Sequence, residues 1–210
     1  MSHQFIREQA WRFLLKQKIN YLPIDPLALA FQLNYAVFPY EEASSLLDTT
    51  PQWLANEFDN DGYCFWSNKM KKFVICYNSS LPFSICRWTI LHEIAHIYLQ
   101  HIPPKAENMN RVRAPFRTLF EIEAQGFARR VLCPSIVLHG CQAFQPDEIM
   151  RLCGISREAA RYRSEHMRIL ESRNQFRLHP LERKVEKQFL PFINYYNQKQ
   201  EILKKRIPFF

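Results

Sequence analysis

The stretch that decides the fold is Trp88-Thr-Ile-Leu-His-Glu-Ile-Ala-His-Ile-Tyr-Leu99. It is mostly apolar, and neither Gly nor Pro occurs after residue 83 until residue 103, so it predicts a buried helix. On such a helix His92 and His96 lie on one face, with Cβ atoms about 5–6 Å apart. That separation allows both imidazoles to bind one tetrahedral Zn²⁺, and Glu93 can then reach a water at the open position of the metal.

Polar side chains on so apolar a helix need partners, because burying an unsatisfied polar group is costly. One metal ion satisfies His92 and His96 together and explains why Glu93 stands between them. The alternative is a pair of hydrogen-bonded core histidines. We therefore predict a metal site, with Glu93 as its general base.

A second helix, predicted from Phe116 to Leu132, supplies a further carboxylate. It ends before Cys133-Pro134, because proline disfavours helical backbone in the residue before it. Glu121 and Glu123 are two positions apart on this helix and point in different directions. Glu121 shares its face with small or polar residues that allow close approach to the first helix: Ala124, Gln125 and Ala128. Glu121 is therefore favoured as the third ligand.

The other polar residues near this motif have more open roles. Gln125, one turn after Glu121, can hydrogen-bond a ligand imidazole. Glu123 is the alternative ligand, or a carboxylate that lies on the surface or supports a ligand from behind. His101 is nine positions after His92, on roughly the opposite helix face, and is not expected to bind the metal.

Together the motifs H-E-I-A-H and E-x-E-A-x-x-F-A-x-x-x-L-x-P resemble the ImmA/IrrE-type zinc metallopeptidases of bacteria, phages and mobile elements. Two upstream segments are also similar to this family: Tyr21 to Ala30, and Asp61 to Asn78. The resemblance implies a zincin-like fold, a protein substrate, and the first Glu of the second motif, Glu121, as ligand. It departs from the family where Gln125 replaces Asn or Asp, Cys133 replaces Met and Ala95 replaces Gly.

The resemblance also implies the substrate and the setting. Such enzymes cleave a helix-turn-helix transcriptional repressor and so derepress stress, phage or mobile-element genes. A His₂Glu donor set suits Zn²⁺, although related sites accept other divalent ions such as Mn²⁺.

The turn-forming residues and apolar patterns in the rest of the chain predict an α+β fold that is mainly helical. Gly62–Ser67 and Lys72–Tyr77 flank a polar turn and predict a β-hairpin beside the metal helix, where gluzincins often hold an extended substrate. We predict a zincin-like domain over residues 1–140, a helix-turn-helix-like segment over 141–175 and a basic amphipathic tail over 176–210. In that tail we expect a helix interrupted near Pro191.

The segment after residue 146 indicates a second possible function, the binding of nucleic acid. Gly154 breaks one short helix, and Ser156 caps another that reaches Arg163, as in a helix-turn-helix. Residues 151–210 hold 14 Lys and Arg against 6 Glu, so they carry the whole net charge of +8. Arg157, Arg161 and Arg163 are therefore candidate contacts to nucleic acid. The rival interpretation is a DNA-binding regulator whose metal site is structural or vestigial.

Composition excludes several other classes of protein. No segment offers about 18 uncharged apolar residues, so no membrane span is expected. The N-terminus does not resemble a signal peptide, and we expect a cytoplasmic protein. The six cysteines form no C-x-x-C pair, which argues against a separate cysteine-rich zinc site.

Overall fold

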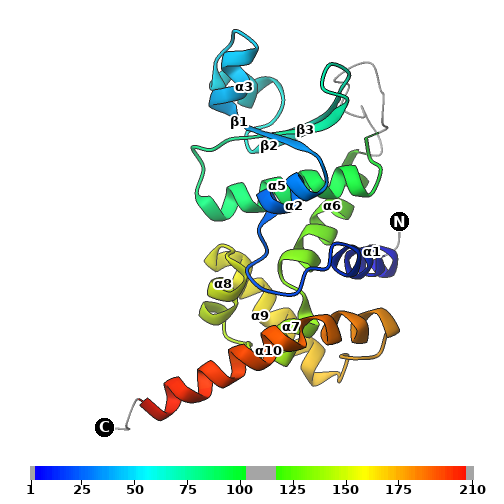
Figure 1. The fold of residues 1–210 in the computed structure, drawn as a ribbon, viewed down its shortest axis with the longest axis vertical. Helices are drawn as coiled ribbons and strands as arrows, with labels where there is room; N and C mark the ends of the chain where they lie inside the picture. Colours follow the sequence, from blue (N-terminus) through cyan, green and yellow to red (C-terminus); the bar gives the residue numbers. More distant parts are fainter. Residues whose placement is uncertain (1–2, 103–116, 207–210) are drawn as a thin grey trace. The chain divides into compact units, whose positions relative to one another are not determined.

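The computed structural model describes residues 3–102 and 117–206. The described elements, in chain order, are α1 (His3–Lys16), α2 (Pro26–Gln32), β1 (Ala36–Pro39), α3 (Tyr40–Leu46), α4 (Pro51–Glu57), β2 (Gly62–Ser67), β3 (Lys72–Tyr77), α5 (Phe83–Tyr98), α6 (Arg117–Leu132), α7 (Ser135–Gly140), α8 (Pro146–Cys153), α9 (Arg157–Ser172) and α10 (Pro180–Arg206) (Figure 1). Helices dominate and the strands form one small sheet, which confirms the predicted α+β class with a helical C-terminal part.

The chain divides into two compact units. Unit 1 comprises Met1–Ile6 and Asp25–Ala128, and unit 2 comprises Arg7–Ile24 and Arg129–Phe210. Helices α1 and α6 therefore each contribute residues to both units. The domain boundaries expected after residues 140 and 175 remain predictions.

Unit 1 is built around a three-stranded sheet in the order β1-β3-β2. β1 runs parallel to β3, and β2 runs antiparallel to it, with Tyr63 opposite Cys76. The turn between β2 and β3 is held by Ser67, whose hydroxyl accepts a hydrogen bond from the backbone N of Met70 at 3.1 Å. The predicted hairpin is thus confirmed, and β2 lies at one edge of the sheet.

The two faces of the sheet have different partners because side chains alternate along each strand. Tyr63, Val74 and Cys76 share a buried cluster with Tyr40 of α3 and Leu54 of α4. The opposite face packs against α5, which contacts both β2 and β3, and α2 packs against α5 in turn (Figure 1).

One glycine sets how closely β2 approaches α5. A Cβ atom on Gly62 would overlap the Thr89 side chain of α5 and would lie only 2.8 Å from the Cys76 carbonyl oxygen. Because only glycine fits between these groups, β2 is held directly against the helix that carries the H-E-x-x-H motif.

Helix α5 is anchored by apolar residues on most of its circumference. Ile90, Leu91 and Ile94 are at most 2% exposed. Burying a side chain of this size stabilises a fold by about 1.5–3 kcal/mol, so these residues fix the position of the helix. α6 ends at Leu132 as predicted, whereas its expected first residue, Phe116, lies outside the described residues.

Unit 2 contains α7, α8, α9, most of α1 and α10. α8 ends at Gly154, which has a φ of 63°, and the Ser156 side chain caps α9 by accepting from the Ala159 backbone N at 3.2 Å. The break and the cap were predicted correctly. The end at Arg163 was not, because α9 continues to Ser172.

The predicted interruption of the C-terminal helix near Pro191 is wrong. α10 runs from Pro180 to Arg206 with Pro191 inside it. Buried Val185, Phe189 and Ile193 fix one face of the helix within unit 2. Gln188 of α10 also donates to the Leu14 and Ile19 carbonyl oxygens at 2.9 and 2.6 Å, and this packing offsets the loss of one helical hydrogen bond. Among the helices described, none is both long enough and apolar enough to cross a membrane.

Candidate metal centre

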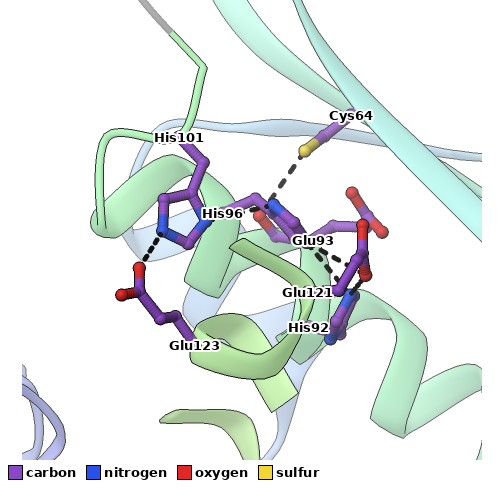
Figure 2. A network of polar contacts seen from close by, with 7 residues as sticks. All are labelled: Cys64, His92, Glu93, His96, His101, Glu121 and Glu123. Atoms are coloured by element: carbon purple, nitrogen blue, oxygen red, sulfur yellow. Dashed lines mark hydrogen bonds and ion pairs between the residues drawn. The ribbon is translucent and has the colours of Figure 1, made fainter. Parts of the chain in front are cut away.

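Three potential ligand atoms from α5 and α6 converge in unit 1 (Figure 2). Nε2 of His92 lies 3.0 Å from Oε2 of Glu121 and 3.0 Å from Nε2 of His96. Nε2 of His96 lies 3.7 Å from the same Glu121 oxygen. The two histidines are one turn apart on α5, and Glu121 approaches them from α6.

These distances fit a zinc ion. Metal–ligand bonds of about 2.0–2.1 Å in a tetrahedral arrangement place neighbouring ligand atoms about 3.3 Å apart. The observed separations of 3.0, 3.0 and 3.7 Å bracket that value. Two imidazoles and one carboxylate are also the donor set of many catalytic zinc sites, which leave one position open for water or substrate.

The electrostatics of the cluster favour a cation. Hydrogen bonds with His92 and His96 hold the pKa of Glu121 well below its usual range, so this carboxylate is ionised. Burial lowers the pKa of His92, but the hydrogen bond to Glu121 and the negative charges of Glu93 and Glu121 outweigh burial and raise it. The side chains of His92 and His96 are only 13% and 12% exposed, which shields these interactions from solvent.

Glu93 lies beside the cluster in a buried position. Glu93 is 8% exposed. Burial raises the pKa of its carboxyl group, although the nearby imidazoles of His96 and His92 act to lower it. A carboxylate with a raised pKa is suited to accept and return a proton near neutral pH.

Strand β2 passes directly over this residue. The Cys64 thiol of β2 lies 3.6 Å from the backbone carbonyl oxygen of Glu93, to which it donates (Figure 2). Burial raises the pKa of Cys64, so the thiol stays protonated and serves packing rather than nucleophilic chemistry.

A second chain of contacts runs behind His96. Nδ1 of His101 lies 3.2 Å from Nδ1 of His96, and Nε2 of His101 lies 3.2 Å from Oε2 of Glu123 (Figure 2). The side chains of His101 and Glu123 are each 2% exposed. Burial and the neighbouring His96 lower the pKa of His101 to about 4, so its imidazole is neutral at pH 7.

Sequence reasoning missed the contact between His101 and His96. His101 was placed opposite His92 by assuming that the helix continues, but α5 ends at Tyr98. Gln100 has a φ of 61°, and the chain then folds back so that the His101 backbone N donates to the His96 carbonyl oxygen at 2.9 Å.

The two residues predicted to lie near Glu121, Glu123 and Gln125, occupy different environments in the structure. Glu123 is buried beside His101, so it is not a surface residue, and it lies outside the cluster of three ligand atoms. Gln125 is exposed and, in the described part of the chain, hydrogen-bonds neither imidazole. The hydrogen bond from Gln125 to a ligand imidazole stays a prediction, whereas the imidazole of His101 lies next to that of His96.

The three arginines predicted to contact nucleic acid differ in their exposure to solvent. Arg157 and Arg161 line a small pocket of unit 2 with Gln145, Pro146 and Asp147, and Arg157 lies 3.5 Å from the Asp147 carboxylate. Arg163 is only 5% exposed, and its guanidinium donates to the Cys133 carbonyl oxygen. The buried position of Arg163 disfavours a contact with nucleic acid, which stays a prediction for Arg157 and Arg161.

Comparison with known proteins identifies the region that contains the cluster. The family model of peptidase M78, described as the IrrE N-terminal-like domain, matches residues 54–165. This match spans more than half of the 210 residues and includes every residue of the cluster. No curated protein matches the chain.

Proposed function

The chain belongs to the peptidase M78 family, and from that premise we propose that it is a zinc-dependent endopeptidase of the ImmA/IrrE type. The observation that carries the proposal is the convergence of three ligand atoms, all within 4.8 Å of one another, beside a buried glutamate. A pair of core histidines does not by itself need a carboxylate from another helix at the same point.

We assign His92, His96 and Glu121 as the residues that hold the ion. A bound Zn²⁺ supplies a water activated for attack near neutral pH and a Lewis acid for the peptide carbonyl, and Mn²⁺ is the alternative ion. The ionised state of Glu121 supports this assignment, because a carboxylate must be deprotonated to bind a metal.

Glu93 acts as the general base in this proposal. It accepts a proton from the attacking water and returns it to the leaving amine, which a carboxylate with a raised pKa can do in both directions. Glu93 is buried beside β2, which limits the access of bulk water to its carboxylate.

Strand β2 is the proposed holding site for the substrate backbone. It lies at an edge of the sheet, and Cys64 places it over Glu93. An extended peptide that pairs with such an edge gains main-chain hydrogen bonds whatever its sequence.

The proposed substrate is a helix-turn-helix transcriptional repressor, cleaved in the cytoplasm. This part of the proposal rests on the family resemblance rather than on a feature of the site. The alternative function, a DNA-binding regulator with a structural metal site, is supported by the exposed Arg157 and Arg161 and by the net charge of +8 in residues 151–210.

The decisive experiment compares the unaltered protein with Glu93→Gln. Each is incubated with Zn²⁺ or Mn²⁺ and with any repressor encoded beside its gene, and cleavage is followed by mass spectrometry. We expect Glu93→Gln to bind the metal and to lose cleavage by about 10²–10⁴-fold, the usual contribution of a general base. Glu57→Gln, an exposed carboxylate on α4, is the matched control.

Two results would contradict the proposal. Cleavage that survives Glu93→Gln would remove the assigned mechanism. DNA binding that weakens steeply with salt, without cleavage of any candidate repressor or of a cell lysate, would favour the regulator instead.

A further inference from the structure

We propose that His101 and Glu123 are positioning residues that hold His96 in the orientation and tautomer needed to bind the metal. This inference rests on the proposed metal site and adds residues that the H-E-x-x-H motif does not contain. It is carried by the chain of contacts Glu123–His101–His96, which is buried and ends at the ligand cluster (Figure 2).

The geometry links three side chains in series. Oε2 of Glu123 is 3.2 Å from Nε2 of His101, and Nδ1 of His101 is 3.2 Å from Nδ1 of His96. Phe120 stacks on the His101 imidazole, with ring centroids 4.3 Å apart and planes 9° apart. His101 is therefore fixed both by packing on its face and by polar contacts at its two nitrogens.

The order of donors along this chain determines the tautomer of His96. Within this proposal the hydrogen between the first pair lies on Nε2 of His101, because an imidazole N–H donates and the Glu123 carboxylate oxygen 3.2 Å away accepts. With one hydrogen on the His101 ring, its Nδ1 atom accepts, and Nδ1 of His96 donates to it across 3.2 Å. This leaves Nε2 of His96 with a free lone pair, directed at the other two ligand atoms.

His92 provides an internal comparison. Its Nδ1 atom is buried and has no hydrogen-bond partner among the described residues, and its imidazole stacks near Trp88 at a centroid distance of 6.4 Å. Among the described residues, the imidazole of His96 is therefore linked at Nδ1 to a carboxylate, and that of His92 is not. The relay thus fixes the orientation of His96 in particular.

The first experiment measures zinc affinity by competition with a chromophoric chelator. His101→Phe preserves the stacking on Phe120 but removes both polar contacts, and we expect zinc affinity to fall about 10–100-fold, as for other residues that orient metal ligands. Glu123→Gln keeps an acceptor for His101 but loses its charge, so a smaller loss is expected. In the double variant the two losses should not add, because both act through His96.

Phe120→Leu is the matched control. It disturbs the packing of His101 while it leaves both nitrogens bonded, so zinc affinity should remain near that of the unaltered protein. If Phe120→Leu and His101→Phe weaken zinc binding equally, His101 acts only by filling space and the relay is wrong.

A second measurement needs no variant. Long-range ¹H–¹⁵N NMR spectra of the zinc-loaded protein report which imidazole nitrogens carry hydrogen. We expect hydrogen on Nδ1 of His96 and on Nε2 of His101. Hydrogen on Nδ1 of His101 would reverse the chain of donors and overturn the inference, even if His101→Phe fails to fold.

The failure of this inference can be distinguished from failure of the proposed function. If the unaltered protein binds no zinc, both are wrong. If it binds zinc and cleaves its substrate but His101→Phe binds zinc equally well, the endopeptidase stands and only the relay is removed.

Discussion

The two units use buried polar side chains for different purposes. In unit 1 the buried residues Glu123 and His101 support His96, whose Nε2 atom faces two further ligand atoms. In unit 2 the buried guanidinium of Arg163 donates to the Cys133 carbonyl oxygen and contacts His166 at 3.4 Å. A buried polar network that ends in several converging lone pairs indicates a functional site. A buried polar network that ends on the backbone stabilises the fold.

The largest effect should come from the third ligand. Glu121→Ala removes the only carboxylate in the described cluster of three ligand atoms, so we expect zinc affinity to fall by more than about 100-fold, beyond the loss typical of supporting residues. Competition with a chelator measures the loss, with Glu57→Ala as the control. A greater loss for Glu123→Ala than for Glu121→Ala would show that the ligand has been assigned to the wrong glutamate.

A smaller effect is expected from crowding β2 against α5. Gly62→Ala brings a Cβ atom onto the Thr89 side chain and within 2.8 Å of the Cys76 carbonyl oxygen, which cannot move without shifting the strand. We expect the free energy of unfolding to fall by about 1–3 kcal/mol, with cleavage impaired more than zinc binding.

Gly140→Ala tests the same change in unit 2. There the added Cβ meets only the flexible Ile193 side chain, at 2.8 Å from its Cδ1 atom, so a smaller loss of stability is expected. Chemical denaturation of both variants measures the difference. Equal losses would mean that the close approach of β2 to α5 is not a special constraint.

The buried arginine of unit 2 should affect stability but not the metal. Arg163→Met leaves the Cys133 carbonyl oxygen without its donor, and we expect a loss of about 1–3 kcal/mol in the free energy of unfolding. Zinc affinity should be unchanged. Weaker DNA binding at unchanged stability would instead assign Arg163 to a nucleic-acid surface.

The smallest effect concerns the pH dependence of unit 2. Burial and the guanidinium groups of Arg163, Arg130 and Arg129 lower the pKa of His166 to about 4. Because this pKa lies below the value of about 6.5 in an unfolded chain, the unfolded state binds more protons, and stability is lost as pH falls from about 6.5 towards 4.

His166→Gln removes this dependence. Its melting temperature should fall less than that of the unaltered protein between pH 7 and pH 4.5, and the difference should be small because His166 is exposed to solvent. Parallel curves for the two proteins would show that His166 titrates normally in the folded state.

Local sequence signals predicted the elements that carry the site. The apolar run around His92 fixed α5, the residue pair Cys133-Pro134 marked the end of α6, and the polar turn after Ser67 marked the hairpin. Each of these signals acts within a few residues of the feature that it predicts, so no knowledge of tertiary structure was needed.

The errors arose where packing or chain reversal overrides a local rule. Pro191 does not interrupt α10, because buried neighbours and Gln188 hold the helix on both sides of it. His101 contacts His96, which the sequence did not predict, because the chain turns back after Tyr98. A helical periodicity cannot describe residues that follow the end of the helix.

The sequence by itself determined the chemistry that the chain offers: two histidines at helical spacing, a glutamate between them, and a downstream carboxylate. Ligand spacing within one helix depends only on backbone geometry, which the local sequence fixes. The face of the second helix already favoured Glu121 over Glu123, whereas the tertiary structure alone decided how the two helices meet and that Glu123 reaches His96 through His101. Those outcomes depend on the packing of α6 against α5, and the packing of two helices is set by all the side chains between them rather than by any single motif.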